Sequence, residues 1–276
     1  MKAKYINPFT DFGFKKIFGE EASKPMLIDF LTSLLPEAHI IDLAFKDKDK
    51  LGQGEDDRKA IYDIYCESNT GEKIIVELQK AKQNYFKDRT VYYATFPIQE
   101  QAEKGEWNYQ LNYVYCIGIL DFKFDDKIKN GNGEVIHTVQ LKDQSNKIFY
   151  EKLKFIYLEM PHFIKEEQQL ETRLDKWLYF IKHLEDFQNI PEVFKDDVFI
   201  KAFEIAEIAK YSENERHDYE QSLKVYRDLK VVIETAFDDG QTKKTLEIAK
   251  KLKDKGMDID FIIETTGLIK SEIDKL

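Results

Sequence analysis

The sequence predicts an α/β fold: a mixed β-sheet core flanked by helices, followed by a helical C-terminal region. Two segments rich in β-forming residues, joined by the short turn 69–72, predict a β-hairpin. A helical pattern and another buried strand follow this hairpin, which is typical of helices packed on a sheet. From about residue 164 onward the periodicity is helical. The 276 residues suffice for one large domain, or for one core domain with a small appendage.

The N-terminal segment is expected to contain a helix, a strand and a loop. Ser23 and Pro25 are typical of a helix start, and Pro36 is typical of its end. The segment 40–47 is strand-like, and the charged, glycine-bearing segment 46–59 predicts a mobile loop. These elements lead into the hairpin.

The hairpin is predicted to consist of 60–68 and 73–81, and a long amphipathic helix follows at 84–104. Pro97 is expected to interrupt or kink that helix. Further strands are predicted at 112–122, 134–143 and 153–160. Further helices are predicted at 166–188, 191–211, 213–237 and 241–255.

These patterns divide the chain into three segments: a core (1–160), a helical region that packs on or extends the core (161–240), and a small tail (241–276). The tail suggests a helix-turn-helix-like element with Gly267 in its turn. Its last helix is short and not basic, which favours packing or self-association over DNA reading. We therefore expect any homo-oligomer to form through the helical C-terminal region.

Composition restricts the function classes. No run of residues approaches the about 18 apolar residues of a membrane span, so we expect no membrane partner. The start lacks the apolar region of a signal peptide, so we expect a cytoplasmic protein. Cys66 and Cys116 lie in apolar strands and are expected to pack as small hydrophobic residues. The net charge of −10 argues against a chain built to coat nucleic acid.

Three polar side chains interrupt the predicted hairpin, and their spacing suggests a metal site. A strand alternates faces, so Glu77 and Gln79 point the same way. The turn brings Asp63 across from Glu77. Two such carboxylates repel unless a divalent cation joins them, and the backbone carbonyl of Leu78 offers a further ligand. The same spacing also fits a hydrogen-bonded polar patch that binds no ion.

Asp63 and the following Glu77-Leu78-Gln79 resemble the PD-(D/E)XK nuclease motif, in which an Asp on one strand precedes a Glu or Asp, any residue and a Lys on the next. Longer segments resemble the recombination-promoting nuclease / putative transposase family of bacteria: "NPFTDFGFKKIFG", "DIYCESNTGEKIIVELQ", "YFKDRTVYYATFPIQEQAEKGEWNY" and "LEIAKKLKDKGMDIDFIIETTGLIKSEIDKL". This resemblance covers most of the chain and is weakest around 122–235.

The resemblance implies a restriction-endonuclease-like fold and a metal-dependent endonuclease that hydrolyses DNA phosphodiester bonds in recombination or mobile elements. It implies Asp63, Glu77 and Gln79 as catalytic residues. Mg²⁺, or Mn²⁺ in its place, would be held by Asp63, Glu77 and the Leu78 carbonyl. The products would carry a 5′-phosphate and a 3′-hydroxyl.

The chain departs from the motif at Gln79, which occupies the lysine position. A lysine offers positive charge to the transition state, whereas an amide only forms hydrogen bonds. Lys82 lies three residues after Gln79, near the end of the strand, and is a candidate for a displaced charge, while Lys80 faces the opposite side from Gln79. The alternative function is therefore a catalytically weak or inactive nuclease-fold module that binds DNA or protein.

Basic residues beside the motif are candidates for substrate contact. Lys80 and Arg89 belong to a locally basic segment, and the planar fork of Arg89 suits a phosphate. Arg89 fits equally a salt bridge to Glu77 or Asp88. By the resemblance, Asp11 is an accessory acid on the first helix, and the alternative is that Asp11 caps this helix.

Overall fold

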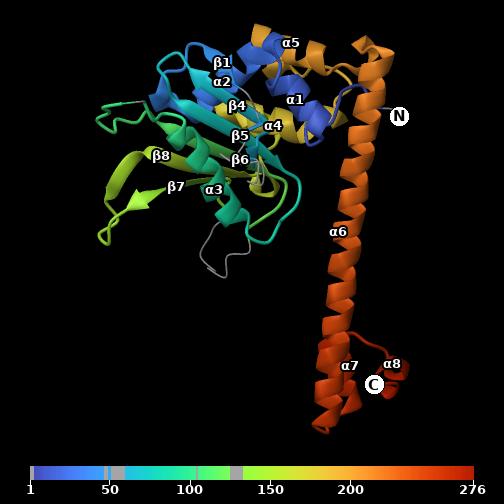
Figure 1. Ribbon diagram of the computed structural model, residues 1–276. Coiled ribbons are helices and arrows are strands. Elements are labelled where there is room, and N and C mark those ends of the chain that lie inside the picture. Colours follow the sequence, from blue (N-terminus) through green and yellow to red (C-terminus); the bar gives the residue numbers. More distant parts are fainter. Residues whose placement is uncertain (1–2, 47–48, 51–59, 104, 125–132) are drawn as a thin grey trace. The chain divides into compact units, whose positions relative to one another are not determined.

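The computed structural model of the chain describes residues 3–46, 49–50, 60–103, 105–124 and 133–276. Six strands form the main sheet: β1 (Leu43–Phe45), β4 (Ile64–Ser68), β5 (Lys73–Gln79), β6 (Val114–Leu120), β7 (Ile136–Lys142) and β8 (Ile148–Glu159). Their order is β1-β4-β5-β6-β8-β7 (Figure 1). The strands β5, β6 and β8 run parallel, and β1, β4 and β7 are antiparallel to their neighbours. The expected mixed sheet is thus confirmed.

The predicted hairpin is present, because β4 pairs with β5 in antiparallel register. Its first strand is not continuous over 60–68 as expected. The short strand β3 (Ala60–Ile61) ends before a bend at Asp63, and it pairs with β2 (Asp49–Lys50) outside the main sheet. The predicted loop 46–59 otherwise lies almost entirely outside the described residues.

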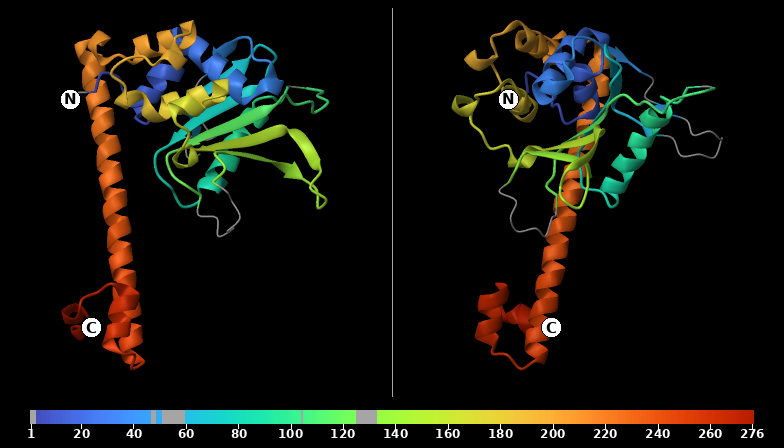
Figure 2. Two further views of the ribbon diagram at one scale, coloured as in Figure 1. Left: turned by 180° about the vertical axis from the view of Figure 1, so that it is seen from behind. Right: turned by 90° about the vertical axis from the view of Figure 1, so that its left-hand side faces the viewer.

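Helices cover both faces of the sheet. On one face, α3 (Phe86–Gln99) packs against a core cluster that includes Tyr65, Ile75 and Tyr157. On the other side (Figure 2) lie α1 (Asp11–Phe18), α2 (Lys24–Leu34), α4 (Arg173–His183) and α5 (Asp197–Ala206). Cover on both faces explains why β6 is buried along its whole length.

Several predicted helices are present but shorter. The helix expected at 84–104 is α3, which continues through Pro97 and ends two residues later. The helix after Ser23 has Pro25 in its first turn, and it ends before Pro36 as predicted. The helices expected at 166–188 and 191–211 reduce to α4 and α5, flanked by short 3₁₀ turns.

The C-terminal helices differ from the prediction in one respect. Instead of separate helices at 213–237 and 241–255, a single helix of 42 residues, α6 (Glu213–Asp254), passes through Gly240. A glycine inside a helix costs about 1 kcal/mol relative to alanine, which the helix-forming residues around it offset. The predicted turn at Gly267 is present, because this residue ends α7 (Ile259–Thr266) in the left-handed conformation with φ of 70°.

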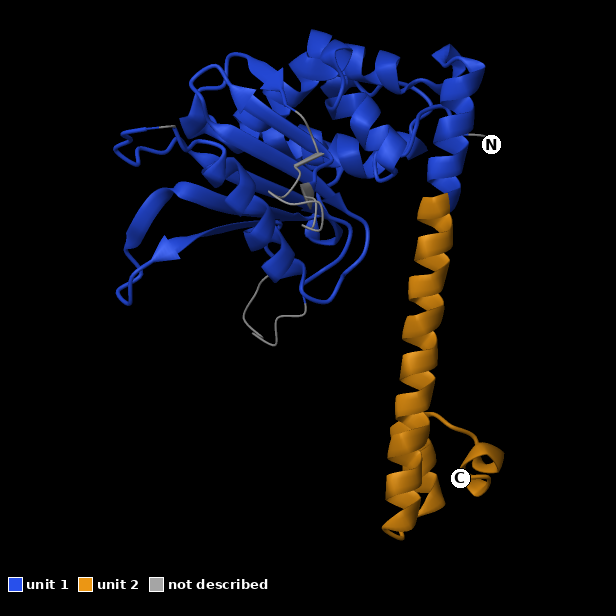
Figure 3. Cartoon of the chain, viewed as in Figure 1, with its two compact units in different colours: residues 1–224 blue, residues 225–276 orange. Residues whose placement is uncertain are grey.

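The chain forms two compact units, residues 1–224 and 225–276 (Figure 3). The second unit has a small core of its own, in which Ala249, Ile262 and Ile273 are buried. The three segments expected from the sequence, with boundaries at 160 and 240, stay a prediction. Among the described helices, none combines the length and the apolar character that a membrane crossing requires.

Candidate active site

Two carboxylates meet at the carboxyl end of β5, beside the start of β4. The backbone N–H of Asp63 donates to Oε1 of Glu77 at 3.2 Å. The backbone N–H of Leu78 donates to Oδ2 of Asp63 at 2.7 Å. Each carboxylate is therefore held by the backbone next to the other. The structure thus brings together the two acids that the sequence placed on the hairpin, although Asp63 lies at a bend and not within a strand.

The electrostatics of this pair favour an added positive charge. Burial raises the pKa of Asp63, against the effect of the hydrogen bond from Leu78. Burial, and then the negative charge of Asp63, raise the pKa of Glu77 to about 8. With no cation bound, Glu77 therefore keeps its proton at neutral pH. A nearby cation would favour the ionised form of both groups.

Gln79 and Arg89 extend this pair toward α3. Nε2 of Gln79 donates to Oε2 of Glu77 at 3.3 Å, so the two side chains share a face as the strand alternation predicts. Arg89 on α3 donates from Nη2 to Oε1 of Gln79 and from Nη1 to Oε1 of Gln83, the latter at 2.6 Å. The positive charge of Arg89 thus lies directly behind the amide in the lysine position. It lowers the pKa of Glu77 against the larger effects of burial and of Asp63.

Two lysines predicted near the site differ in position. Lys80 directly follows β5, and its charge lowers the pKa of Asp63 against the larger effect of burial. Lys82 is exposed and lines a hollow beside the site. β5 ends at Gln79, and the odd spacing of three residues would in any case not place Lys82 on the face of Gln79.

The start of α1 lies close enough for its charges to act on Asp63. Asp11 is the first residue of α1, where it forms an ion pair of 3.0 Å with Lys15. The N-cap is Thr10, whose side chain accepts from the N–H of Gly13, so the alternative that Asp11 caps this helix is wrong. After burial, the charge of Asp11 raises the pKa of Asp63, and that of Lys15 lowers it.

Sequence reasoning missed three residues at this site. Lys15 is one of them, and its spacing of four residues from Asp11 on a helix was the available signal. Gln83, which anchors Arg89, carried no signal. Gly118 is the neighbour of Glu77 in the parallel register of β5 and β6. A Cβ atom there would lie 3.0 Å from Cδ1 of Tyr157, and a glycine within a buried strand was the signal of this close approach.

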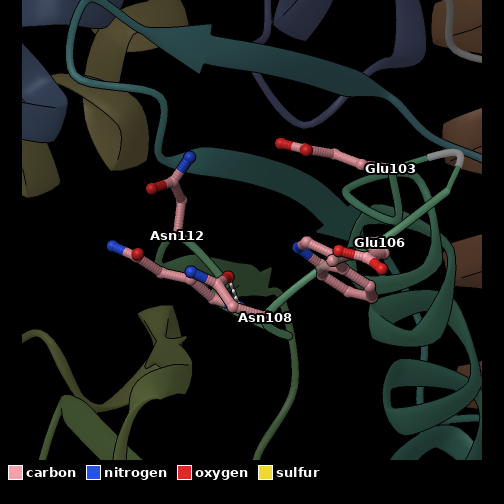
Figure 4. A pocket seen from close by; sticks show the side chains of 6 residues that line it. Glu103, Glu106, Asn108 and Asn112 are labelled. Atoms are coloured by element: carbon pink, nitrogen blue, oxygen red, sulfur yellow. Dashed lines mark hydrogen bonds between the residues drawn. The ribbon is translucent and has the colours of Figure 1, made fainter.

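A second hollow, of about 660 Å³, lies at the other end of the sheet, before β6 begins. Its lining (Figure 4) consists of Glu103, Glu106, Trp107, Asn108, Gln110 and Asn112. Its two carboxylates would repel a phosphate. This hollow therefore lacks the features of a nucleic-acid site, and the pair formed by Asp63 and Glu77 remains the candidate.

Comparison with known proteins identifies a family for the chain. The family model described as PD-(D/E)XK nuclease family transposase matches residues 8–236, a range that contains the whole candidate site. No curated protein and no solved structure matches the chain.

Proposed function

The chain belongs to the PD-(D/E)XK nuclease family transposases, and from this premise we propose that it is a metal-dependent endonuclease that hydrolyses phosphodiester bonds in DNA. The family membership confirms the resemblance read from the sequence and the restriction-endonuclease-like α/β fold. One observation carries the proposal. Asp63 and Glu77 lie half-buried beside each other, held by the backbone N–H groups of Leu78 and Asp63 respectively, and desolvation raises the pKa of both.

The residues present fit a divalent cation such as Mg²⁺ or Mn²⁺. Mg²⁺ is usually bound by one or two carboxylates, waters and substrate phosphate oxygens. No group of three or more His, Cys, Asp or Glu ligands occurs in the described ranges, so Asp63 and Glu77 would be the side-chain ligands. The N–H and C=O of one strand residue point to the same neighbouring strand. Because the N–H of Leu78 points to Asp63, its carbonyl also faces that side and would add a third ligand.

The chain's own residues have distinct roles in this proposal. A bound cation supplies positive charge to the attacked phosphate and lowers the pKa of water. Asp63 is fixed by the N–H of Leu78, and Glu77 gives up its proton when the site is loaded. Gln79 orients Glu77 and accepts from Arg89. Arg89 therefore supplies the positive charge that the motif lysine provides elsewhere, and Lys80 contacts the DNA backbone.

The experiment is a plasmid-nicking assay with Mg²⁺ or Mn²⁺, comparing the wild type with Asp63→Ala and Glu77→Ala. We expect metal-dependent nicking by the wild type and its loss in both variants. Titration of Mn²⁺ into each protein, followed by calorimetry, gives a readout that does not depend on turnover. No nicking by the wild type, or nicking that survives in both variants, would contradict the proposal.

The alternative is a catalytically weak or inactive nuclease-fold module that binds DNA or protein. The amide of Gln79 in the lysine position favours it. It predicts Mn²⁺ and DNA binding by the wild type without nicking. Its link to mobile elements rests on the family description, and self-association through the C-terminal helices stays a prediction.

A further inference from the structure

A hollow of about 290 Å³ lies directly beside the candidate active site. It is bounded by the connection from β5 to α3 and by the segment that follows β6. Its lining includes Lys82, Gln83, Tyr85, Lys87, Phe122 and Phe124, together with one carboxylate, Asp88.

Aromatic rings form one wall of this hollow. Phe122 and Phe124 are half-buried, and their ring centroids lie 5.9 and 6.1 Å from that of Phe86. The ammonium of Lys87 lies 5.0 Å from the centroid of Phe124. A hollow lined by half-buried aromatic rings and by two lysines against one carboxylate suits a flat, aromatic ligand that carries negative charge.

Tyr85 lies at the edge of the hollow in an unusual state. Its side chain is 80% exposed, and its backbone is left-handed with a φ of 61°. It occupies the N-cap position of α3 without forming a side-chain cap hydrogen bond. The ring of Tyr85 therefore lies exposed at the rim of the hollow.

Hydrogen bonds connect the hollow to the carboxylate pair. Gln83 lines the hollow, and its Oε1 accepts from Nη1 of Arg89 at 2.6 Å. The other arm of Arg89 donates to Gln79, which in turn donates to Glu77. A chain of hydrogen bonds therefore links the hollow to Glu77.

We propose that this hollow receives an unpaired nucleobase of the DNA strand that is cut, an inference that rests on the proposed function. Ring faces stack on any base, and ammonium groups accompany the phosphates, which is how proteins bind single strands. In a continuous duplex a base must first be unpaired and unstacked before it can enter the hollow, so a nucleotide that is already unpaired enters at lower cost. The substrate class is then DNA with an unpaired nucleotide beside the cut: a single strand, a flap or a bubble.

Fluorescence anisotropy with the full-length Glu77→Gln protein, without divalent metal, tests this inference without requiring turnover. The probes are a labelled duplex with a three-nucleotide bubble and the same duplex fully paired. Tyr85→Asn removes the ring, and asparagine tolerates the left-handed backbone. We expect it to weaken binding of the bubble about tenfold and to leave the paired duplex within about twofold. Tyr85→Phe, which keeps the ring, should restore the affinity.

Tyr109→Asn is the matched control, because Tyr109 is also 80% exposed with a φ of 61°. It lies in the segment before β6 and should bind both probes as the parent does. Equal binding of the bubble by Tyr85→Asn and its parent would overturn the inference and leave the nuclease proposal intact. If binding of the bubble depends on the ring of Tyr85 but the wild type does not cut DNA, the result would support the nucleobase site and contradict the nuclease proposal.

Discussion

Two clusters of carboxylates in the first unit have opposite electrostatic arrangements. In the helical layer, Arg173 donates to Asp29 and to Asp196, from Nε and Nη1 respectively, each at 2.6 Å. At the end of β5, the described partners of Asp63 and Glu77 are backbone N–H groups and the amide of Gln79. In the first cluster the guanidinium of Arg173 contacts both carboxylates directly. In the second, the guanidinium of Arg89 contacts Gln79, and only the amide of Gln79 contacts Glu77.

The directions of the pKa shifts follow this difference. Burial opposes ionisation of Asp196, but the bonds from Arg173 outweigh it and lower the pKa of that carboxyl group. Burial and the charge of Asp63 raise the pKa of Glu77. A carboxylate cluster that holds a guanidinium therefore stabilises the fold, whereas one that lacks it is suited to bind a cation from outside.

The largest expected effect separates activity from stability at Glu77. Glu77→Gln keeps the shape of the side chain but removes its charge, so we expect the nicking rate to fall by about 10³-fold or more. The free energy of unfolding without metal should stay the same or rise, because a buried ionisable group is removed. Plasmid nicking and urea denaturation measure the two quantities, and a loss of stability in this variant would contradict the comparison.

The opposite pattern is expected at Arg173. Arg173→Met leaves Asp29 and Asp196 without their cation, and we expect the free energy of unfolding to fall by about 3 kcal/mol. The nicking rate of the folded fraction should not change, since the cluster does not belong to the candidate site. Urea denaturation checks the first expectation. If the variant is as stable as the wild type, the helical cluster is not the stabilising counterpart inferred here.

A smaller effect is expected at Gln79. Gln79→Ala breaks the connection between Glu77 and Arg89, and we expect about 10²-fold slower nicking, equivalent to about 2.7 kcal/mol in the barrier. Gln79→Lys brings a positive charge into the lysine position and should retain or raise the rate. Single-turnover nicking of a defined DNA distinguishes these variants. Unchanged cutting by Gln79→Ala would remove Gln79 from the mechanism.

The last prediction concerns pH. The folded protein holds the proton of Glu77 up to about pH 8, whereas the unfolded chain releases it near the ordinary glutamate value. Stability without metal should therefore fall as pH rises between about 4.5 and 8. Thermal unfolding across this range tests the slope. Glu77→Gln should flatten it, and Mg²⁺ should offset it at the alkaline end.

Much of this site follows from local pattern. The turn 69–72 and the alternation of β5 suffice to predict that Glu77 and Gln79 share a face and that Asp63 approaches them. The continuity of α6 through Gly240 was not predictable in the same way. A glycine permits both a break and a helix, and the surrounding helix decides between them.

The sequence by itself determined which residue types lie on the hairpin, their shared face and the family to which the chain belongs. Only the tertiary structure decided that Asp63 sits at a bend, that Arg89 reaches Gln79 from α3, and that Asp11 pairs with Lys15 while Thr10 caps the helix. The physical reason is the range of the interactions. The periodicity of neighbouring residues sets the direction in which each side chain points. The burial and the pairing of charges instead depend on segments from distant parts of the chain that fold together.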